Sequence, residues 1–171
     1  MNRRQFLKAG MAGGIVLAAG GAWIAWRDMR DADDGEPARD RIALIVGALA
    51  PVILAGTLPS DSAERSAGIA RVVAGVKSVI LEFPPAVQQE IADLFRSLDI
   101  RFARLLLTGI RPGWSQATPG EIAAFLERWR TSRIGLLQSG YFALHDLVLG
   151  AWYASPAAWA AIGYPGPPNV E

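Results

Sequence analysis

Apolar residues recur at three- and four-residue intervals along most of the chain after residue 40, which is the spacing of one buried face of an α-helix. No stretch shows the sustained alternation of apolar and polar positions that is typical of a half-buried strand. Proline, glycine and capping residues divide the pattern into segments. The predicted helices cover residues 41–55, 61–82, 84–109, 118–130, 133–155 and 156–162. We therefore expect an all-α fold, a bundle of five or six helices after an N-terminal signal or anchor helix.

Two of the predicted helix starts have a clear chemical reason. Asp61 precedes an apolar face and has Glu64 three residues later, which is an acidic variant of the capping box. Thr118 and Glu121 form a capping box around a proline at the first helical position. The first helix contains Pro51, which should kink it or end its first half.

The longest uninterrupted apolar stripe lies between Pro84 and Gly109. It predicts one continuous amphipathic helix of about six turns. Its polar face should carry Arg96, Arg101 and Arg104. The apolar stripe consists of Val87, Ile91, Leu94, Phe95, Leu98, Phe102, Leu105 and Leu106.

The N-terminus has a pattern of its own. A short basic segment precedes an uncharged apolar run over residues 9–26, as in an export signal. The adjacent arginine pair resembles the twin-arginine translocation signal, which is an address read by a receptor. The residues that match its consensus are Arg3, Arg4, Phe6, Leu7 and Lys8. A general secretory signal with two incidental arginines is the alternative interpretation.

The fate of this signal stays open. The uncharged run of 18 residues would rise about 27 Å as a helix, close to the hydrocarbon thickness of a bilayer. A small-x-small site at residues 20–22 favours cleavage, whereas Trp23 and Trp26 suit the aromatic belt of an uncleaved membrane anchor. Residues 27–40 read as a charged linker, and residues 41–171 as one helical domain.

Composition narrows the chemistry that this chain can perform. It has no cysteine and a single histidine, which excludes disulfides, thiol nucleophiles, iron–sulfur clusters and any multi-histidine metal site built by this chain alone. The net charge is +1, and apart from the three basic residues of the leader the chain has more acidic than basic residues. No basic field remains to attract nucleic acid.

The remaining catalytic candidates are weak. His145 lies among apolar residues of a helix, where a packed or interfacial histidine is the ordinary interpretation, and Asp146 should not orient it because helix neighbours diverge by about 100°. Glu90 and Asp93 are three residues apart and could meet on one helix face, but such a pair is usually solvated. We predict no catalytic, cofactor-binding or metal-binding residue in this chain.

Aromatic residues gather near the C-terminus, beside a proline-rich tail. They could fold back to close the bundle, or they could anchor a partner, because tryptophan and tyrosine are common interface anchors. The residues predicted to bind a partner are Trp152, Tyr153, Trp159, Tyr164, Pro165 and Gly166.

The chain resembles the gluconate 2-dehydrogenase subunit 3 family, the small subunits of membrane-bound flavin dehydrogenases. The resemblance is tight over residues 3–8 and roughly residues 118–168, and between these segments it rests on length and helix pattern. It is carried by the leader, the helical body and the C-terminal sequence GAWYASP, followed by Trp159 and the sequence GYPGP.

The resemblance implies a non-catalytic role in an oxidoreductase complex. The family's large subunit is a flavoprotein of the glucose–methanol–choline type that holds FAD, and a multihaem cytochrome c subunit often passes electrons to the membrane. The small subunit carries no known cofactor and is thought to supply the twin-arginine signal and to stabilise its partner. We accordingly expect a periplasmic location. A membrane-tethered adaptor unrelated to redox chemistry and a free-standing periplasmic enzyme are the alternatives.

Overall fold

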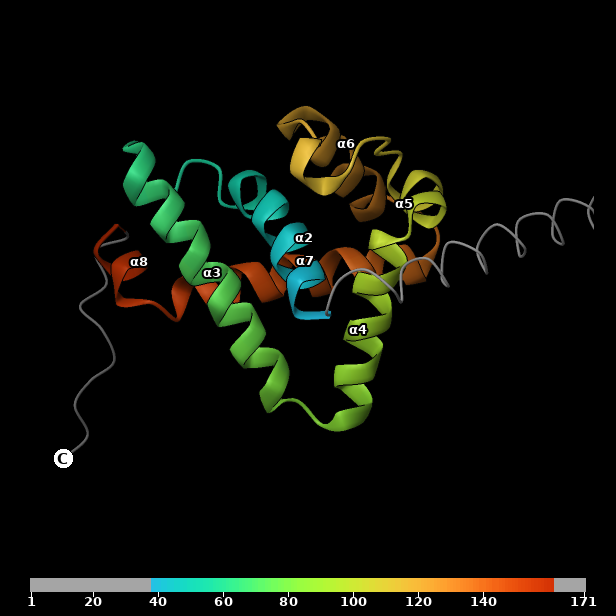
Figure 1. Ribbon diagram of the computed structural model, residues 1–171, viewed down its shortest axis with the longest axis horizontal. Coiled ribbons are helices and arrows are strands. Elements are labelled where there is room, and N and C mark those ends of the chain that lie inside the picture. The colour runs from blue at the N-terminus through green and yellow to red at the C-terminus, as the bar shows by residue number, and fades with distance from the viewer. Residues whose placement is uncertain (1–37, 162–171) are drawn as a thin grey trace, which may run out of the picture.

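The computed structural model describes residues 38–161, with side chains for residues 41–156, 158 and 159 (Figure 1). The elements in chain order are α2 (Ala38–Ile53), α3 (Ser62–Glu82), α4 (Pro85–Asp99), α5 (Arg101–Thr108), the 3₁₀ helix η1 (Trp114–Gln116), α6 (Pro119–Arg130), α7 (Gly135–Tyr153) and α8 (Pro156–Ala161). Six of these α-helices have at least eight residues, and no strand occurs within the described range. The prediction of an all-α fold is confirmed. The predicted signal helix lies outside the described residues.

Helix ends follow the predicted capping residues. The Asp61 carboxylate accepts hydrogen bonds from the backbone N–H groups of Ala63 and Glu64, each at 2.9 Å. The capping box at the start of α6 is complete, because Thr118 N–H donates to the Glu121 carboxylate at 2.8 Å and Glu121 N–H donates to the Thr118 hydroxyl at 3.3 Å. These bonds satisfy backbone donors that a helix start otherwise leaves unpaired.

The predicted continuous helix between Pro84 and Gly109 is wrong in one respect. The chain leaves helical geometry at Ile100, where ψ is 119°, so α4 and α5 are separate helices. The break rotates α5 away from the expected stripe, and Leu105 and Leu106 lie exposed rather than buried. The spacing of apolar residues does not reveal this break, because Ile100 is itself apolar and buried and so continues the pattern.

Charged groups connect α2 to this break. Arg41 is buried, and its Nε donates to the Asp99 carboxylate at 2.8 Å. Arg104 is also buried, against the prediction of a polar face, and its Nη1 donates to the Asp99 carbonyl oxygen at 2.9 Å. Burial lowers the pKa of Arg104, while the Asp99 carboxylate opposes that shift. The end of α4 is therefore held against α2 by paired charge.

Helix α7 crosses behind α2 and α3 in Figure 1 and contacts α2, α3, α6 and α8. Its contact with α3 depends on small residues: a Cβ built on Gly75 would lie 3.0 Å from the Ala151 Cβ. The contact of α7 with α6 also depends on a small residue, because a Cβ built on Gly140 would lie 2.5 Å from Trp129 Cζ3. The Trp129 indole is fixed by a hydrogen bond of 2.8 Å from its Nε1 to the Leu107 carbonyl oxygen. Close backbone approach thus places α7 against both neighbours.

The close packing at Gly140 predicts a specific loss of stability. Gly140→Ala should lower the free energy of unfolding by roughly 1–3 kcal/mol, the usual cost of overpacking, because the added methyl group meets an indole that cannot move freely. Gly150→Ala is the matched control on the same helix, since a Cβ there meets no atom within 4 Å. The control should be neutral or stabilising by up to about 1 kcal/mol. Urea denaturation of both variants measures the difference, and equal stability of the two would contradict this packing.

Candidate functional site

An apolar groove of about 680 Å³ lies between α3, α4 and α7. Helices α3 and α4 are joined at Phe83 and Pro84 and diverge from that turn, as Figure 1 shows, and residues of α7 line the space between them. Gln88 fixes the turn, because its Nε2 donates to the carbonyl oxygens of Leu81 at 3.2 Å and Phe83 at 2.8 Å. The groove therefore results from the way in which α3 and α4 diverge from this turn over α7.

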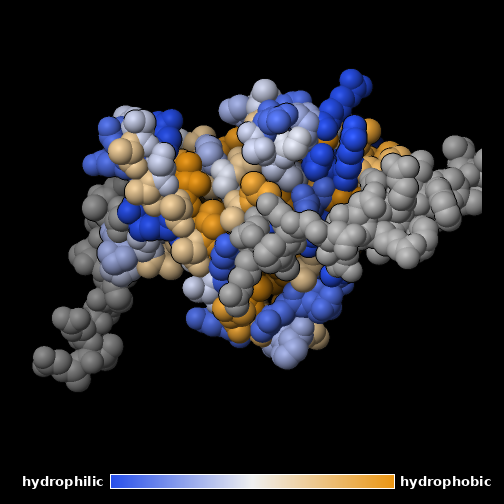
Figure 2. Space-filling view, in the orientation of Figure 1, coloured by the Kyte–Doolittle hydropathy of each residue, from blue (hydrophilic) through white to orange (hydrophobic). Residues whose placement is uncertain are grey.

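The interior of the groove is hydrophobic. Figure 2 shows hydrophobic atoms between the lower ends of α3 and α4. Part of the lining is remote from solvent, such as Ile91 and Ala151, and part is exposed, such as Leu136 and Phe83. The main apolar lining residues are Val79, Phe83, Val87, Ile91, Leu94, Leu136, Leu137 and Leu147.

Carboxylates border this apolar interior. Glu90 and Asp93 of α4 and Asp146 of α7 line the groove, and all three are exposed. Asp93 lies 3.6 Å from Arg96 Nη1, in an exposed ion pair that should contribute little to stability. The sequence prediction that Glu90 and Asp93 could share one helix face is consistent with this placement. The sequence pattern does not predict the groove, because the groove depends on the divergence of two helices.

His145 and Asp146 lie closer together than the helical spacing predicts. The Nδ1 of His145 lies 3.5 Å from Asp146 Oδ1, although the two residues are neighbours on α7. The imidazole also stacks on the Tyr141 ring, with centroids 5.3 Å apart and planes inclined by 28°. The arrangement is that of a packed histidine beside the groove.

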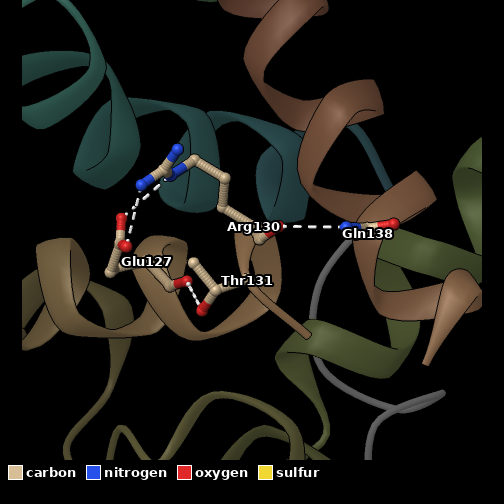
Figure 3. Close-up of polar contacts among 4 residues, drawn as sticks. All are labelled: Glu127, Arg130, Thr131 and Gln138. Atoms are coloured by element: carbon tan, nitrogen blue, oxygen red, sulfur yellow. Dashed lines mark hydrogen bonds and ion pairs between the residues drawn. The ribbon is translucent and has the colours of Figure 1, made fainter. Parts of the chain in front are cut away.

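One polar contact connects the N-terminal end of α7 to the end of α6, beside further polar contacts within α6 (Figure 3). Arg130 donates through Nε and Nη2 to the two carboxylate oxygens of Glu127, both at 2.9 Å. Gln138 Nε2 donates to the Arg130 carbonyl oxygen at 3.3 Å, and Thr131 Oγ1 donates to the Glu127 carbonyl oxygen at 2.8 Å. The contact from Gln138 holds the first turns of α7, and with them Leu136, beside the groove.

The structure separates the aromatic residues that were predicted to bind a partner. Trp152 is 3% exposed and belongs to the core, where it lies 3.4 Å from a Cβ built on Gly68. Tyr153 is exposed, and its carbonyl oxygen accepts a hydrogen bond of 2.7 Å from Trp159 Nε1. Trp159 itself is half-buried against the core. For Trp152, the alternative that the aromatic residues fold back to close the bundle is therefore the one observed.

Other predicted site residues lie outside residues 38–161. These are the export-signal residues Arg3, Arg4, Phe6, Leu7 and Lys8 and the tail residues Tyr164, Pro165 and Gly166. Among the described residues, no three acidic or histidine side chains gather in a way that could hold a metal ion. None of the helices described is long and apolar enough to span a membrane.

The chain was also compared with known proteins. No family model, no curated protein and no solved structure matches it.

The two carboxylates of α6 predict an acid-sensitive contribution to stability. Hydrogen bonds from the Thr118 backbone and hydroxyl lower the pKa of Glu121, and the hydrogen bonds from Arg130 lower the pKa of Glu127. A lowered folded-state pKa adds stability above the unfolded value of about 4.5, and this stability is lost as the pH falls through the folded value. Melting temperatures of the wild type and Glu121→Gln should therefore differ most above pH 4.5 and converge below it. A constant difference from pH 6 to pH 3 would contradict this assignment.

Proposed function

We propose that this chain is the non-catalytic small subunit of a periplasm-facing, flavin-dependent dehydrogenase complex of the glucose–methanol–choline type. In this proposal it supplies the twin-arginine export signal and stabilises the catalytic subunit. The leader and the C-terminal sequence motif support the family, and the described surface supports the binding role. FAD belongs to the large subunit in this complex, and a cytochrome c subunit is a further partner.

The observation that carries the proposal is the amount of large apolar side chain at the surface. Leu136 is 80% exposed, Leu106 68% and Leu81 63%, and Phe142 and Ile134 are more than half exposed. Single exposed apolar residues are ordinary, but here they accompany an apolar groove of about 680 Å³. Apolar surface of this kind favours a protein that is covered by a partner.

The rest of the molecule is consistent with a stabilising subunit. Its core is built from residues of α2, α3, α4, α6 and α7 and includes two tryptophans whose indole N–H groups are paired with carbonyl oxygens: Trp114 Nε1 donates to Leu98 at 2.9 Å, and Trp129 Nε1 donates to Leu107. Such a core can hold the helices in place before a partner arrives. The twin-arginine pathway exports folded proteins, so it is suited to a complex of this chain and its partner that assembles before export.

Affinity purification tests the proposed partner. The full chain with a C-terminal tag is expressed in its native host and purified from membranes solubilised in mild detergent. We expect a large flavoprotein to copurify in constant ratio, identified by its yellow flavin absorbance and by mass spectrometry. Copurification of a protein without flavin would favour the adaptor alternative instead.

The export role predicts the effect of two conservative substitutions. Arg3→Lys combined with Arg4→Lys keeps the charge but removes the guanidinium pair, so both this chain and the flavoprotein should remain in the cytoplasm. Arg27→Lys with Arg30→Lys is the matched control outside the motif and should leave export unchanged. Cell fractionation with immunoblotting and flavin fluorescence measures both proteins. Normal export of the first variant would show that the arginine pair is incidental.

A further inference from the structure

We propose that the groove between α3, α4 and α7 receives an amphipathic helix of the partner protein, whose apolar face enters the groove and whose lysine or arginine residues meet the carboxylates at its border. The inference rests on the proposed function for the identity of the partner. The lining and border of the groove determine the chemistry of the occupant. This surface is distinct from the aromatic C-terminal end.

The dimensions of the groove suit a short helix. Its lining residues extend along α7 from Leu136 to Ala151 and along α4 from Val87 to Ser97. At 1.5 Å per residue these stretches measure about 22 Å and 15 Å. A helix of about 10 to 15 residues spans that length and presents apolar side chains at intervals of three and four residues, as in other helix-in-groove complexes.

The charge of the border selects a basic occupant. Among the described residues that line the groove, three are acidic and none is basic: Glu90, Asp93 and Asp146. Neighbouring cationic groups offset this charge in part, because Arg96 lies 3.6 Å from Asp93 and His145 lies 3.5 Å from Asp146. Glu90 has no such ion pair within residues 38–161. Complementary charge at the rim of an apolar contact mainly sets specificity and orientation.

The exposed part of the lining favours a helix over a small molecule. Leu136 stands 80% exposed at the border, and Phe83 lies at the turn between α3 and α4. A ligand confined to the interior would leave both side chains in water, whereas a helix lying along the groove covers them. An anionic lipid headgroup would meet carboxylates of its own sign.

Gly150 permits a direct test without a packing defect. It lines the groove within α7, and a Cβ there meets no atom within 4 Å. Gly150→Arg places a long cationic side chain in the groove, four residues from Asp146, and repels a basic occupant. Gly47→Arg in α2 is the matched control, because Gly47 also has open space at Cβ and does not line the groove. Circular dichroism should show equal helical content for both variants.

The first measurement uses a defined probe. A fluorescent 14-residue helical peptide of leucine and lysine is titrated into the full chain, beside a peptide in which glutamate replaces every lysine. We expect the lysine peptide to bind wild type and Gly47→Arg alike, and to bind Gly150→Arg at least tenfold more weakly. The glutamate peptide and the combined variant Glu90→Gln, Asp93→Asn, Asp146→Asn should each show about tenfold weaker binding. Equal affinity for Gly150→Arg, or for the two peptides, would overturn the proposal.

The second measurement uses the complex and separates this proposal from the proposed function. If the flavoprotein copurifies with wild type and Gly47→Arg but is lost with Gly150→Arg, both proposals are supported. If it copurifies equally with Gly150→Arg, the groove proposal is overturned while the proposed function stands. If it copurifies with none of them, the proposed function fails, and the peptide titration alone decides the groove. A wild-type dimer in size-exclusion chromatography that Gly150→Arg dissociates would assign the groove to a second copy and overturn a partner helix.

Discussion

The close approach of α3 to α7 is the constraint on which the rest of the arrangement depends. At the crossing, Gly75 leaves so little space that a Cβ would lie 3.0 Å from the Ala151 Cβ, so only small residues fit at this point. Helix α3 also packs on α2, and it makes few contacts with α4. Helix α4 packs on α2 as well, where the buried Arg41 binds Asp99. Helices α3 and α4 are thus joined by a short turn and both packed on α2, whereas α3 alone of the two packs closely on α7, and the groove lies where they diverge.

The groove links this packing to the proposed role. A chain that folds with an apolar groove and exposed leucines leaves hydrophobic surface in contact with water, and covering that surface favours association. The carboxylates at the border disfavour acidic occupants, because such an occupant would meet groups of its own charge. In this account the small subunit is folded before assembly and gains stability when its partner covers the groove.

Sequence analysis predicted the helices where spacing and capping act locally, as at Asp61 and at the Thr118 capping box. It failed at Ile100, because an apolar residue continues the periodic pattern while its backbone leaves helical geometry. It left Trp152 undecided, because the burial of that ring depends on its close packing against Gly68, a residue more than 80 positions away. The groove was missed for the same reason: its border residues come from α4 and α7, and no local spacing brings Glu90 and Asp146 together.

Hydrogen–deuterium exchange on the complex tests the central claim, that a partner covers the groove between α3, α4 and α7. The chain purified with its partner is compared with the chain purified alone. We predict slower amide exchange in residues 87–97 of α4 and 136–151 of α7 in the complex, with little change in residues 62–70 at the start of α3. Protection confined to other segments, with unchanged exchange along α4 and α7, would show that the groove stays open to solvent and would contradict the account.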